Sequence, residues 1–310
     1  IHHQNQGPEL GVAESSITMT VDAELKEIRP IILGAVVRNI NLEELNIEAN
    51  EFIKSLMDHQ EKLHFALGRG RKRASIGVHD LSTIHPPFRV KAVSGSEKFI
   101  PLAMNKPMTI SDILINHPKG IEYAHLLEGY DKFPVIVDSR DNILSFPPII
   151  NGKQTTVTAS TTDFFIDVTG WDFRSCEASL MLIALQLKEL GGSIESIEIT
   201  DCNGQVNKFP NGNPVEHVLP TKMLDGLLGR ELNETELTKS VNRMGGKFIS
   251  RNREEIIIEM PRWRFDILHP VDLVEDIAIG HGFEDLGEDI PRSPMTAKPR
   301  SDANLLRRVR

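Results

Sequence analysis

The chain has 310 residues and a formal net charge of −9, and 40% of its residues are hydrophobic and 25% charged. This length suits two or more domains, and the composition excludes a membrane-spanning or low-complexity protein. The acidic balance argues against a protein that is coated in nucleic acid, although it is compatible with a local basic track.

The cysteines and the chain ends bear on the cellular setting. Cys176 and Cys202 are too few for a zinc cluster and form no redox motif, so we expect Cys176 to be a small core residue in a reducing, cytoplasmic protein. Residues 1–11 lack the apolar core of a signal peptide. Because the sequence begins without methionine and ends in DANLLRRVR, typical of the first turns of a helix, we expect a piece of a longer protein.

From the N-terminus to about residue 210, the periodicity predicts mixed strands and helices. Residues 1–20 are polar and are predicted to be an irregular arm. Helices are expected at 42–67, 109–128 (one or two short ones, capped by Thr109 or Ser111) and 173–190. Strands and hairpins are expected at 29–40, 74–81, 88–93, 133–148, 147–150, 163–171 and 193–210. Because strict βαβ alternation is missing, the predicted class is α+β with a mixed sheet.

The segment at 211–220 is rich in Asn, Gly and Pro, and it predicts a domain boundary. Beyond it the order is two short helices (221–230 and 234–244), a hairpin (247–260) and a helix from about 270 to 281. This order resembles a winged-helix or helix-turn-helix-like module. The alternative is a small α+β domain without a role in nucleic-acid binding.

A carboxylate interrupts the strand predicted at 163–171. Asp167 lies between Ile166 and Val168, and burying it is unfavourable unless another group pairs with it or uses it. Thr169 points to the same face because side chains two residues apart share a face of a strand. This pattern indicates a functional site. The alternative is a structurally paired carboxylate beside an ordinary sheet residue.

A second constellation is acidic and consists of four carboxylates, Asp266, Asp272, Glu275 and Asp276. The last three stand at i, i+3 and i+4 of the helix predicted from about 270, and Asp266 can fold back toward them. Carboxylate oxygens suit magnesium. The alternatives are that these residues interact with the helix dipole or pair with Arg262 and Arg264, and that His269 is a capping or surface residue.

Four segments together resemble the β-subunit of phenylalanyl-tRNA synthetases of the archaeal and eukaryotic cytosolic type. They are GRGRKRASIGVHDL (68–81), LSFPPIING (144–152), FFIDVTGW (164–171) and PRWRFDILHPVDLVEDIAIGHGF (261–283). The motifs occur in the family's order, and the resemblance runs from about residue 20 to the end of the chain.

The resemblance implies a domain plan. Residues 21–210 would form a tRNA-editing domain that hydrolyses aminoacyl esters, 211–220 a linker, and 221–290 a winged-helix-like domain. Residues 291–310 would begin a truncated C-terminal region, and residues 1–20 remain an N-terminal arm.

The same resemblance implies the function. The family's α-subunit charges the phenylalanine tRNA at the expense of ATP, in an (αβ)₂ heterotetramer, and the β-subunit removes tyrosine that was attached by mistake. ATP would be used by the whole enzyme and not bound by this part. Such editing is needed because an apolar pocket rejects one extra hydroxyl by only about 10²-fold.

The resemblance also assigns residues. Asp167, Thr169 and Ser145 would be catalytic, and with Ile136 they would line the substrate pocket. We expect Asp167 to accept a hydrogen bond from the tyrosine phenol or from the α-ammonium group, and Ser145 and Thr169 to hold the ester or a water. Without the resemblance, Ser145 is more typical of a turn. No serine–histidine–aspartate triad and no cysteine nucleophile are expected, so water or a tRNA hydroxyl would attack the ester.

The resemblance further implies that the four carboxylates match a magnesium site that is shared with the α-subunit. From its residues alone, the basic loop Arg69, Arg71, Lys72 and Arg73 is a candidate for contacts with tRNA phosphates, and the alternative is a solvated loop.

Two other functions stay open. One is a scaffold that docks tRNA or the α-subunit without hydrolysis, and the other is a nucleic-acid-binding regulator. The regulator is disfavoured because the predicted helix at 234–246 carries only Lys239 and Arg243 as cations.

Overall fold

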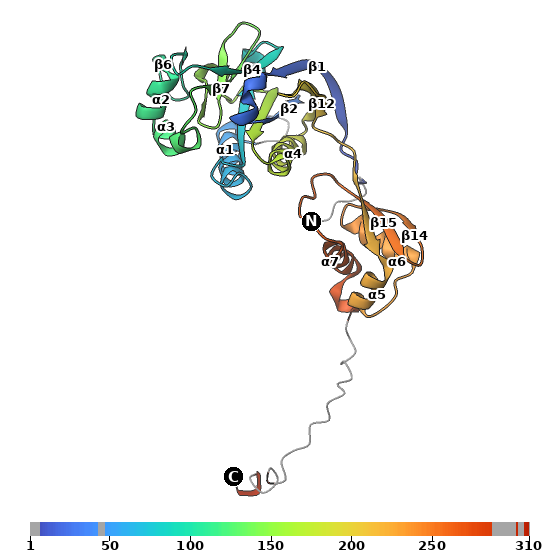
Figure 1. Ribbon diagram of the computed structural model, residues 1–310. Helices are drawn as coiled ribbons and strands as arrows, with labels where there is room; N and C mark the ends of the chain where they lie inside the picture. The colour runs from blue at the N-terminus through green and yellow to red at the C-terminus, as the bar shows by residue number, and fades with distance from the viewer. Residues whose placement is uncertain (1–6, 43–46, 287–301, 303–306, 310) are drawn as a thin grey trace. The chain divides into compact units, whose positions relative to one another are not determined.

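The computed structural model describes residues 7–42, 47–286, 302 and 307–309 (Figure 1). Its contacts divide the chain into two compact units. The larger one, here called the sheet unit, comprises residues 8–215 and also includes 261–266. The small unit comprises residues 216–260 and the described residues from 267 onward. The first residues of the predicted arm (1–6) and most of 291–310 lie outside the described residues.

The sheet unit is built on a ten-stranded mixed sheet, which confirms the predicted α+β class. The strand order is β3-β10-β2-β11-β1-β4-β7-β8-β9, and β12 pairs with β11. β1 runs parallel to both neighbours, β11 and β4, whereas β10 is antiparallel to β2 and β3. The strands are β1 Val12–Val21, β2 Ile31–Arg38, β3 Ala74–Asp80, β4 Phe88–Val93, β7 Phe133–Val137, β8 Ile143–Phe146, β9 Ile150–Asn151, β10 Phe164–Gly170, β11 Ser193–Thr200 and β12 Val206–Phe209.

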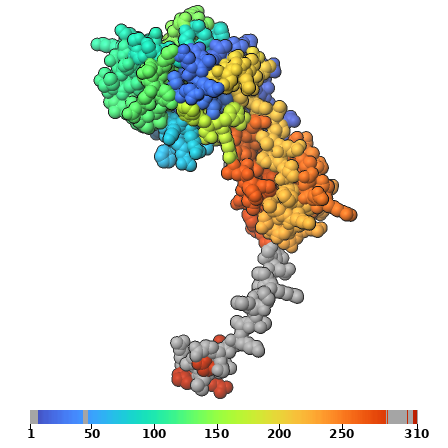
Figure 2. All heavy atoms as spheres, in the orientation of Figure 1, coloured from blue at the N-terminus to red at the C-terminus, as the bar shows by residue number. Residues whose placement is uncertain are grey.

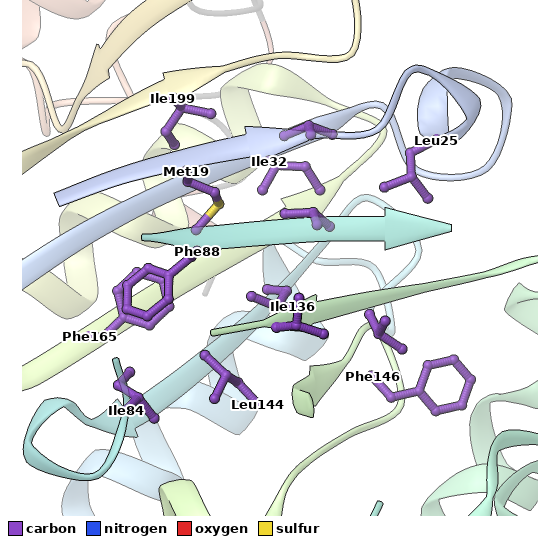
Figure 3. Close-up of a cluster of buried hydrophobic side chains, with 14 of the residues drawn as sticks. Met19, Leu25, Ile32, Ile84, Phe88, Ile136, Leu144, Phe146, Phe165 and Ile199 are labelled. Atoms are coloured by element: carbon purple, nitrogen blue, oxygen red, sulfur yellow. The ribbon is translucent and has the colours of Figure 1, made fainter. Parts of the chain in front are cut away.

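The sheet curls around an apolar core. β4 and β10 are four strand positions apart, which is about 19 Å across a flat sheet. The rings of Phe88 on β4 and Phe165 on β10 nevertheless lie with their centroids only 4.4 Å apart. Figure 3 shows these two rings together, with Met19, Ile136 and Leu144 around them. The curl therefore brings strands from the two halves of the sheet face to face.

Two helices cover the other face of the sheet, α1 (Ala49–Ala66) and α4 (Phe173–Glu189). The alternate residues of β10, such as Phe164 and Ile166, point to this side and pack against Phe52 of α1 and Leu180 of α4. α4 begins at Asp172, whose side chain accepts a hydrogen bond from the Ser175 N–H. α1 lies at the surface of the unit, where Figure 2 shows it in light blue.

A small subdomain follows β4. It contains a short hairpin, β5 (Lys98–Phe99) and β6 (Met108–Thr109), and two short helices, α2 (Ile110–Asn116) and α3 (Pro118–Tyr123). The prediction that Thr109 caps the first helix is confirmed, because Thr109 and Asp112 form a reciprocal capping box.

Three expectations about local structure are wrong. The predicted arm contains β1, an inner strand whose Ile17, Met19 and Val21 alternate into the core. The polar run at its centre, where the register with β11 shifts, hides this alternation. The helix predicted from residue 42 begins at Ala49. Residues 147–149 form a turn and no strand, because consecutive prolines lack the N–H donors that a strand needs.

The small unit has the predicted order of helix, helix, hairpin and helix. Its elements are α5 (Thr221–Leu228), α6 (Glu234–Arg243), β14 (Lys247–Arg251), β15 (Glu255–Met260) and α7 (Pro270–His281). A strand that the sequence reading missed, β13 (Val215–Pro220), pairs with β15 and makes a three-stranded sheet. Leucine, isoleucine and valine side chains from the three helices and from β13 and β15 form most of its core. Among the described residues of the chain, no helix is long and apolar enough to cross a membrane.

Candidate active site of the sheet unit

A pocket of about 630 Å³ lies between β3, α1 and the segment that runs from β8 to residue 157. Its walls are mostly apolar and include Leu56 and Met57 of α1, Val78 of β3, and Pro148 and Ile150. Ser145 and Asp167, two of the residues proposed from the sequence, are among its lining residues. A largely apolar pocket with a few convergent polar groups is typical of a site for a small organic group.

Asp167 lies at the centre of β10, where it faces Gly34 of β2 and Gly77 of β3. Its side chain shares a face with Phe165, as the alternation predicts, and the residue is 1% exposed. Glycine at position 77 leaves the space for the carboxylate, because a Cβ there would lie 2.0 Å from Asp167 Oδ2. Gly77 thus allows a large polar side chain in the middle of the sheet.

His79 holds this carboxylate in place. Its Nε2 lies 2.6 Å from Asp167 Oδ2, and its Nδ1 lies 2.8 Å from Thr155 Oγ1. The ring is fully buried and stacks on Phe165. The Thr155 hydroxyl has one proton, which it can donate to His79 Nδ1 or to the Gly152 carbonyl 3.1 Å away. An ionised carboxylate can only accept a hydrogen bond, so Nε2–H donates to Asp167 Oδ2 in both arrangements. Oδ1 is left to accept from a ligand.

The sequence analysis expected no serine–histidine–aspartate triad, and that expectation stays a prediction. The structure does contain a related chain, because Thr155, His79 and Asp167 contact one another across three separate segments. The nitrogens are used in the opposite order to a serine hydrolase, because the carboxylate contacts Nε2 and the hydroxyl contacts Nδ1. Asp167 and Thr155 both line the pocket, whereas His79 does not, so the buried histidine connects two pocket groups without lining the pocket itself.

Ser145 lies within β8 and not in a turn, which was the alternative. It pairs with Ile136 of β7 and with Asn151 of β9. Its Oγ donates to Asn151 Oδ1 at 3.2 Å, and the Asn151 amide reaches the Val78 carbonyl of β3 at 3.5 Å. This contact links the two ends of the curled sheet, so Ser145 reaches the same pocket as Asp167 although the two strands are distant in the sheet order.

The structure does not place Thr169 in the pocket wall. Its Oγ1 accepts a hydrogen bond of 2.6 Å from Arg29 Nε and lies 3.0 Å from Ser75 Oγ. Arg29 Nη2 also donates to the Thr169 carbonyl, the Arg71 carbonyl and Ser75 Oγ. Burial lowers the pKa of Arg29 to about 10. Thr169 thus reaches the pocket only through Ser75, and a catalytic role for it stays a prediction.

Ile136 was expected to be a pocket wall, but its side chain is fully buried in the apolar core that Figure 3 shows. It does not line the pocket. The reason is the curl of the sheet, which turns this part of β7 toward Phe88 and Phe165. Ile136 pairs with Ser145, which does line the pocket, and its role toward a substrate stays a prediction.

The basic loop after α1 is not uniformly solvated. Arg69, Lys72 and Arg73 are exposed and remain candidates for phosphate contacts. Arg71 is 7% exposed, which corrects the expectation for this residue. Its Nη1 donates to the carbonyls of Pro148 and Ile149, and its guanidinium lies 4.3 Å from the centre of the Tyr123 ring. A left-handed turn at residues 69–71, with φ of 50–65°, directs Arg71 inward to the pocket.

Two of the predicted magnesium ligands, Asp266 and Asp272, have other partners in this chain. Asp266 forms an ion pair with Arg264 at 2.7 Å, and this arginine lowers the pKa of Asp266. Asp272 accepts from the backbone N–H groups of Leu268 and His269 in the capping box of α7. Glu275 is exposed and Asp276 is buried. Within the described ranges, no three histidine, cysteine or acidic side chains gather closely enough to hold a metal, so magnesium stays a prediction.

Two other expectations concern single residues. His269 caps α7, which was one of its two expected roles, and its Nδ1 accepts from the Val271 N–H at 3.2 Å. Cys176 is fully buried, as predicted, and burial raises the pKa of its thiol to about 12.

Several site residues were missed by sequence reasoning. His79 carries the same signal as Asp167, because it is a titratable residue inside an apolar strand, and it could have been found in that way. Thr155, Asn151 and Arg29 give no local signal. They lie in polar or ordinary sequence, and only the register of β3 with β10 and the curl of the sheet bring them to the pocket.

Comparison with known proteins decides the family. Residues 30–185 match the family model of the B3/4 domain, and residues 218–283 match that of the tRNA synthetase B5 domain. The phenylalanine–tRNA ligase β-subunit of Methanosarcina acetivorans is 42% identical over 94% of this chain, and that of Methanosarcina barkeri is 44% identical over 91%. A crystal structure of an N-terminal fragment of the phenylalanyl-tRNA synthetase β-subunit from Pyrococcus horikoshii superposes with a TM-score of 0.81 and is 34% identical. The alignment covers 88% of this chain and 77% of that fragment.

The chain belongs to the phenylalanyl-tRNA synthetase β-subunit family. It spans about half the length of the curated relatives it matches, with 52% of the M. acetivorans and 51% of the M. barkeri protein covered. The B3/4 match lies entirely in the sheet unit, and the B5 match covers most of the small unit together with residues 261–266. The pocket with Asp167 and Ser145 is therefore a feature of the B3/4 part of a phenylalanyl-tRNA synthetase β-subunit.

Proposed function

We propose that the sheet unit hydrolyses tyrosine from the phenylalanine tRNA, as the editing part of a phenylalanine–tRNA ligase that also needs an α-subunit. The observation that supports this best is the pocket. It offers a buried carboxylate, Asp167, and a hydroxyl, Ser145, inside apolar walls that suit an aromatic side chain. The pocket volume suits an aromatic amino acid together with part of a terminal nucleoside.

The chemistry needs little from the protein. The ester that joins an amino acid to a ribose hydroxyl is activated, so a positioned water can add to the carbonyl carbon. The bond to the ribose oxygen then breaks, and a proton passes to that oxygen. Asp167 Oδ1 accepts a hydrogen bond from the substrate, since His79 occupies Oδ2. Ser145 Oγ holds the ester or the water, and the tight geometry supplies the rate through positioning.

The proposal extends to partners. Arg69, Lys72 and Arg73 form an exposed basic loop beside the pocket residue Arg71, where they are able to contact phosphates of the tRNA acceptor end. The acidic residues near α7 would complete a magnesium site only with ligands from the α-subunit, in a heterotetramer that uses ATP. No step of the proposed hydrolysis passes through that metal.

The test is a deacylation assay with tyrosyl- and phenylalanyl-esters of the phenylalanine tRNA, using the complete enzyme reconstituted with its α-subunit. We expect selective release of tyrosine and a loss of about 10- to 100-fold in Asp167→Asn, the size for one hydrogen bond to a charged group. Asp58→Asn is the matched control, because Asp58 is exposed on α1 and lies outside the pocket. Equal rates for wild type and Asp167→Asn would refute the role of Asp167, and no release by wild type would favour a docking scaffold.

A further inference from the structure

The last turn of α1 carries a large apolar side chain that the fold does not bury. Phe65 is 83% exposed, whereas Phe52, near the other end of the same helix, is 3% exposed and packs against the sheet. A single exposed apolar residue is common on protein surfaces and needs no explanation by itself. The groups around Phe65 therefore decide whether its ring has a use.

Four exposed cations lie close to this ring in the chain. They are Lys62, three residues earlier on α1, and Arg69, Lys72 and Arg73 in the loop after the helix. The loop folds back onto the end of α1, because the Gly70 N–H donates to the His64 carbonyl at 2.9 Å and the Arg73 N–H donates to the Gly68 carbonyl at 2.8 Å. Phe65 and the four cations thus form one surface, here called the α1 end surface.

The positive charge of the α1 end surface is not compensated. None of its four cations forms an ion pair with another residue of the described ranges. Glu61, the acidic residue next to Lys62, pairs with Arg71 instead. Elsewhere in the sheet unit, exposed lysines such as Lys132 and Lys208 pair with carboxylates. Four unpaired cations in a chain of net charge −9 favour an anionic partner.

The exposed ring narrows the class of this partner. Cations alone suit any polyanion, but an aromatic ring among cations suits an unpaired nucleotide strand. A base can then stack on the ring while lysine and arginine contact the phosphates. A duplex offers the phosphates without a free base face, and an acidic peptide offers charges without a planar base.

The α1 end surface adjoins the pocket from outside. Glu61, one helical turn before Phe65, lines the pocket, and so does Arg71 between the exposed cations of the loop. Phe65 and the four cations do not line it. A strand whose last nucleoside enters the pocket can therefore continue over this surface.

We infer that the α1 end surface binds the single-stranded 3′ end of a tRNA, with an unpaired base stacked on Phe65 and phosphates beside the four cations. The inference rests on the proposed function, in which the amino acid and the terminal nucleoside enter the pocket. The nucleotides before the terminal one stay outside and need a support of their own. Phe65 holds the strand and does not contact the amino acid, so it acts equally on tyrosyl and phenylalanyl esters.

The test is a binding cycle that changes the ring and the RNA in turn. Fluorescence anisotropy measures the affinity of the 310-residue chain for two uncharged RNA hairpins. The tailed hairpin has the acceptor stem and the unpaired 3′ end of the phenylalanine tRNA, and the blunt hairpin lacks the unpaired end. Phe65→Ala removes the ring and Phe65→Tyr keeps one. Val206→Ala, at a 57% exposed residue of β12, is the matched control, and urea midpoints verify folding.

We expect Phe65→Ala to lower the affinity for the tailed hairpin by about 5-fold or more, the size for one stacked base. Its affinity for the blunt hairpin should equal that of wild type. Phe65→Tyr and Val206→Ala should bind both hairpins as wild type does. An unchanged affinity of Phe65→Ala for the tailed hairpin would overturn the inference, and so would an equal loss on both hairpins.

Salt dependence separates the cations from the ring. Each phosphate contact on a single strand contributes about 0.7 to the slope of log affinity against log salt concentration. Lys72→Gln/Arg73→Gln should therefore reduce the slope by about 1.4, whereas Phe65→Ala should leave it unchanged. Arg140→Gln, at an exposed arginine between β7 and β8, is the control. An unchanged slope in Lys72→Gln/Arg73→Gln would contradict the role of the cations.

These measurements do not depend on hydrolysis, because the RNA carries no amino acid. If the reconstituted enzyme releases neither amino acid but the ring and the unpaired end remain coupled, the proposed function fails and the RNA surface stands. If the enzyme releases tyrosine selectively and Phe65→Ala binds both hairpins like wild type, the inference alone fails. Weaker assembly of Phe65→Ala with the α-subunit, without any effect on RNA, would assign the ring to a protein interface and overturn the inference.

Discussion

The interiors of the two units treat polar groups differently. In the small unit the core consists of leucine, isoleucine and valine with Met260, and two of its buried hydroxyls bond over short stretches of sequence. Ser240 Oγ donates to the Glu236 carbonyl one turn earlier, and Thr221 Oγ1 donates to the Asn252 carbonyl 31 positions away. In the sheet unit, Arg29, His79 and Asp167 are buried and bond to residues 42 to 140 positions away in the sequence.

This difference distinguishes the small unit, whose buried polar groups support its own fold (the framework), from the sheet unit, whose buried polar groups surround a pocket (the site). Buried polar groups that bond only within one helix satisfy local donors and acceptors and have no further consequence. Groups that connect distant strands are unfavourable to bury and hold one another in a single geometry. In the sheet unit they lie directly behind a pocket, which is the arrangement that positions side chains for a ligand.

The largest expected effect tests the buried network itself. Arg29→Met removes the donor to the Thr169 hydroxyl and carbonyl, to Ser75 and to the Arg71 carbonyl, and leaves these acceptors buried without a partner. We expect the sheet unit to lose about 3 kcal/mol of its free energy of unfolding, measured by urea titration. Arg140→Met, at an exposed arginine, is the control and should change it by less than about 0.5 kcal/mol. Equal effects of the two variants would contradict the role of Arg29.

The next effect tests the packing around the carboxylate. In Gly77→Ala the new Cβ would lie 2.0 Å from Asp167 Oδ2 and 2.7 Å from His79 Nε2, so both groups must move. We expect the affinity for a non-hydrolysable 3′-amide analogue of tyrosyl-adenosine (the tyrosyl analogue), measured by calorimetry, to fall by about 10-fold or more. The reason is that a hydrogen bond to a charged group is lost. Gly226→Ala is the matched control. It adds a methyl group to an open position of α5 in the small unit, so it should leave binding unchanged and raise helix stability by about 0.5–1 kcal/mol.

A smaller effect belongs to the small unit. Asn233 caps α6 through its side chain, and the Glu236 side chain accepts from the Asn233 N–H in return. Asn233→Ala should lower the stability of this unit by about 1 kcal/mol in thermal or urea unfolding. Binding of the tyrosyl analogue should not change. If it weakens, the small unit contributes to the pocket and the comparison between framework and site fails.

The smallest effect is a pH dependence. Burial lowers the pKa of His64 in the folded protein below its ordinary value of 6.5. Between the two pKa values the unfolded chain binds more protons, so the contribution of His64 to stability is full above about pH 6.5 and is lost as the pH falls toward the folded-state pKa. Urea midpoints from pH 7.5 to 5 should therefore fall more steeply in wild type than in His64→Gln. Parallel curves would show that His64 is not held neutral.

Much of the secondary structure could be predicted because its causes are local. The apolar run in FFIDVTGW predicts β10, Thr109 caps α2, and the Asn203–Gly204 pair marks the turn between β11 and β12, where Gly204 has a φ of 80°. The strand β1 was missed because its polar centre coincides with a shift of register, and β13 was missed because it lies in a segment rich in Asn, Gly and Pro.

The candidate site was predicted in part. Asp167 stands out because a carboxylate in an apolar strand is unfavourable without a use, and the structure places it in a pocket with Ser145. Arg71 was grouped with its solvated neighbours because all four cations look alike in the sequence. Its inward direction comes from a left-handed turn and from carbonyls 77 and 78 residues away, which no local pattern reveals.

The sequence by itself thus determined most of the elements, a boundary within 211–220, the family resemblance and the carboxylate at the centre of the site, because periodicity, capping and burial of charge act over a few residues. Only the tertiary structure decided that Thr155 and His79 stand behind Asp167, that Ile136 lies in the core, and that Arg71 lines the pocket while its neighbours in the loop are exposed. The physical reason is the register of β3 against β10 together with the curl of the sheet. Both are set by the packing of the whole core and bring together side chains that have no pattern in common.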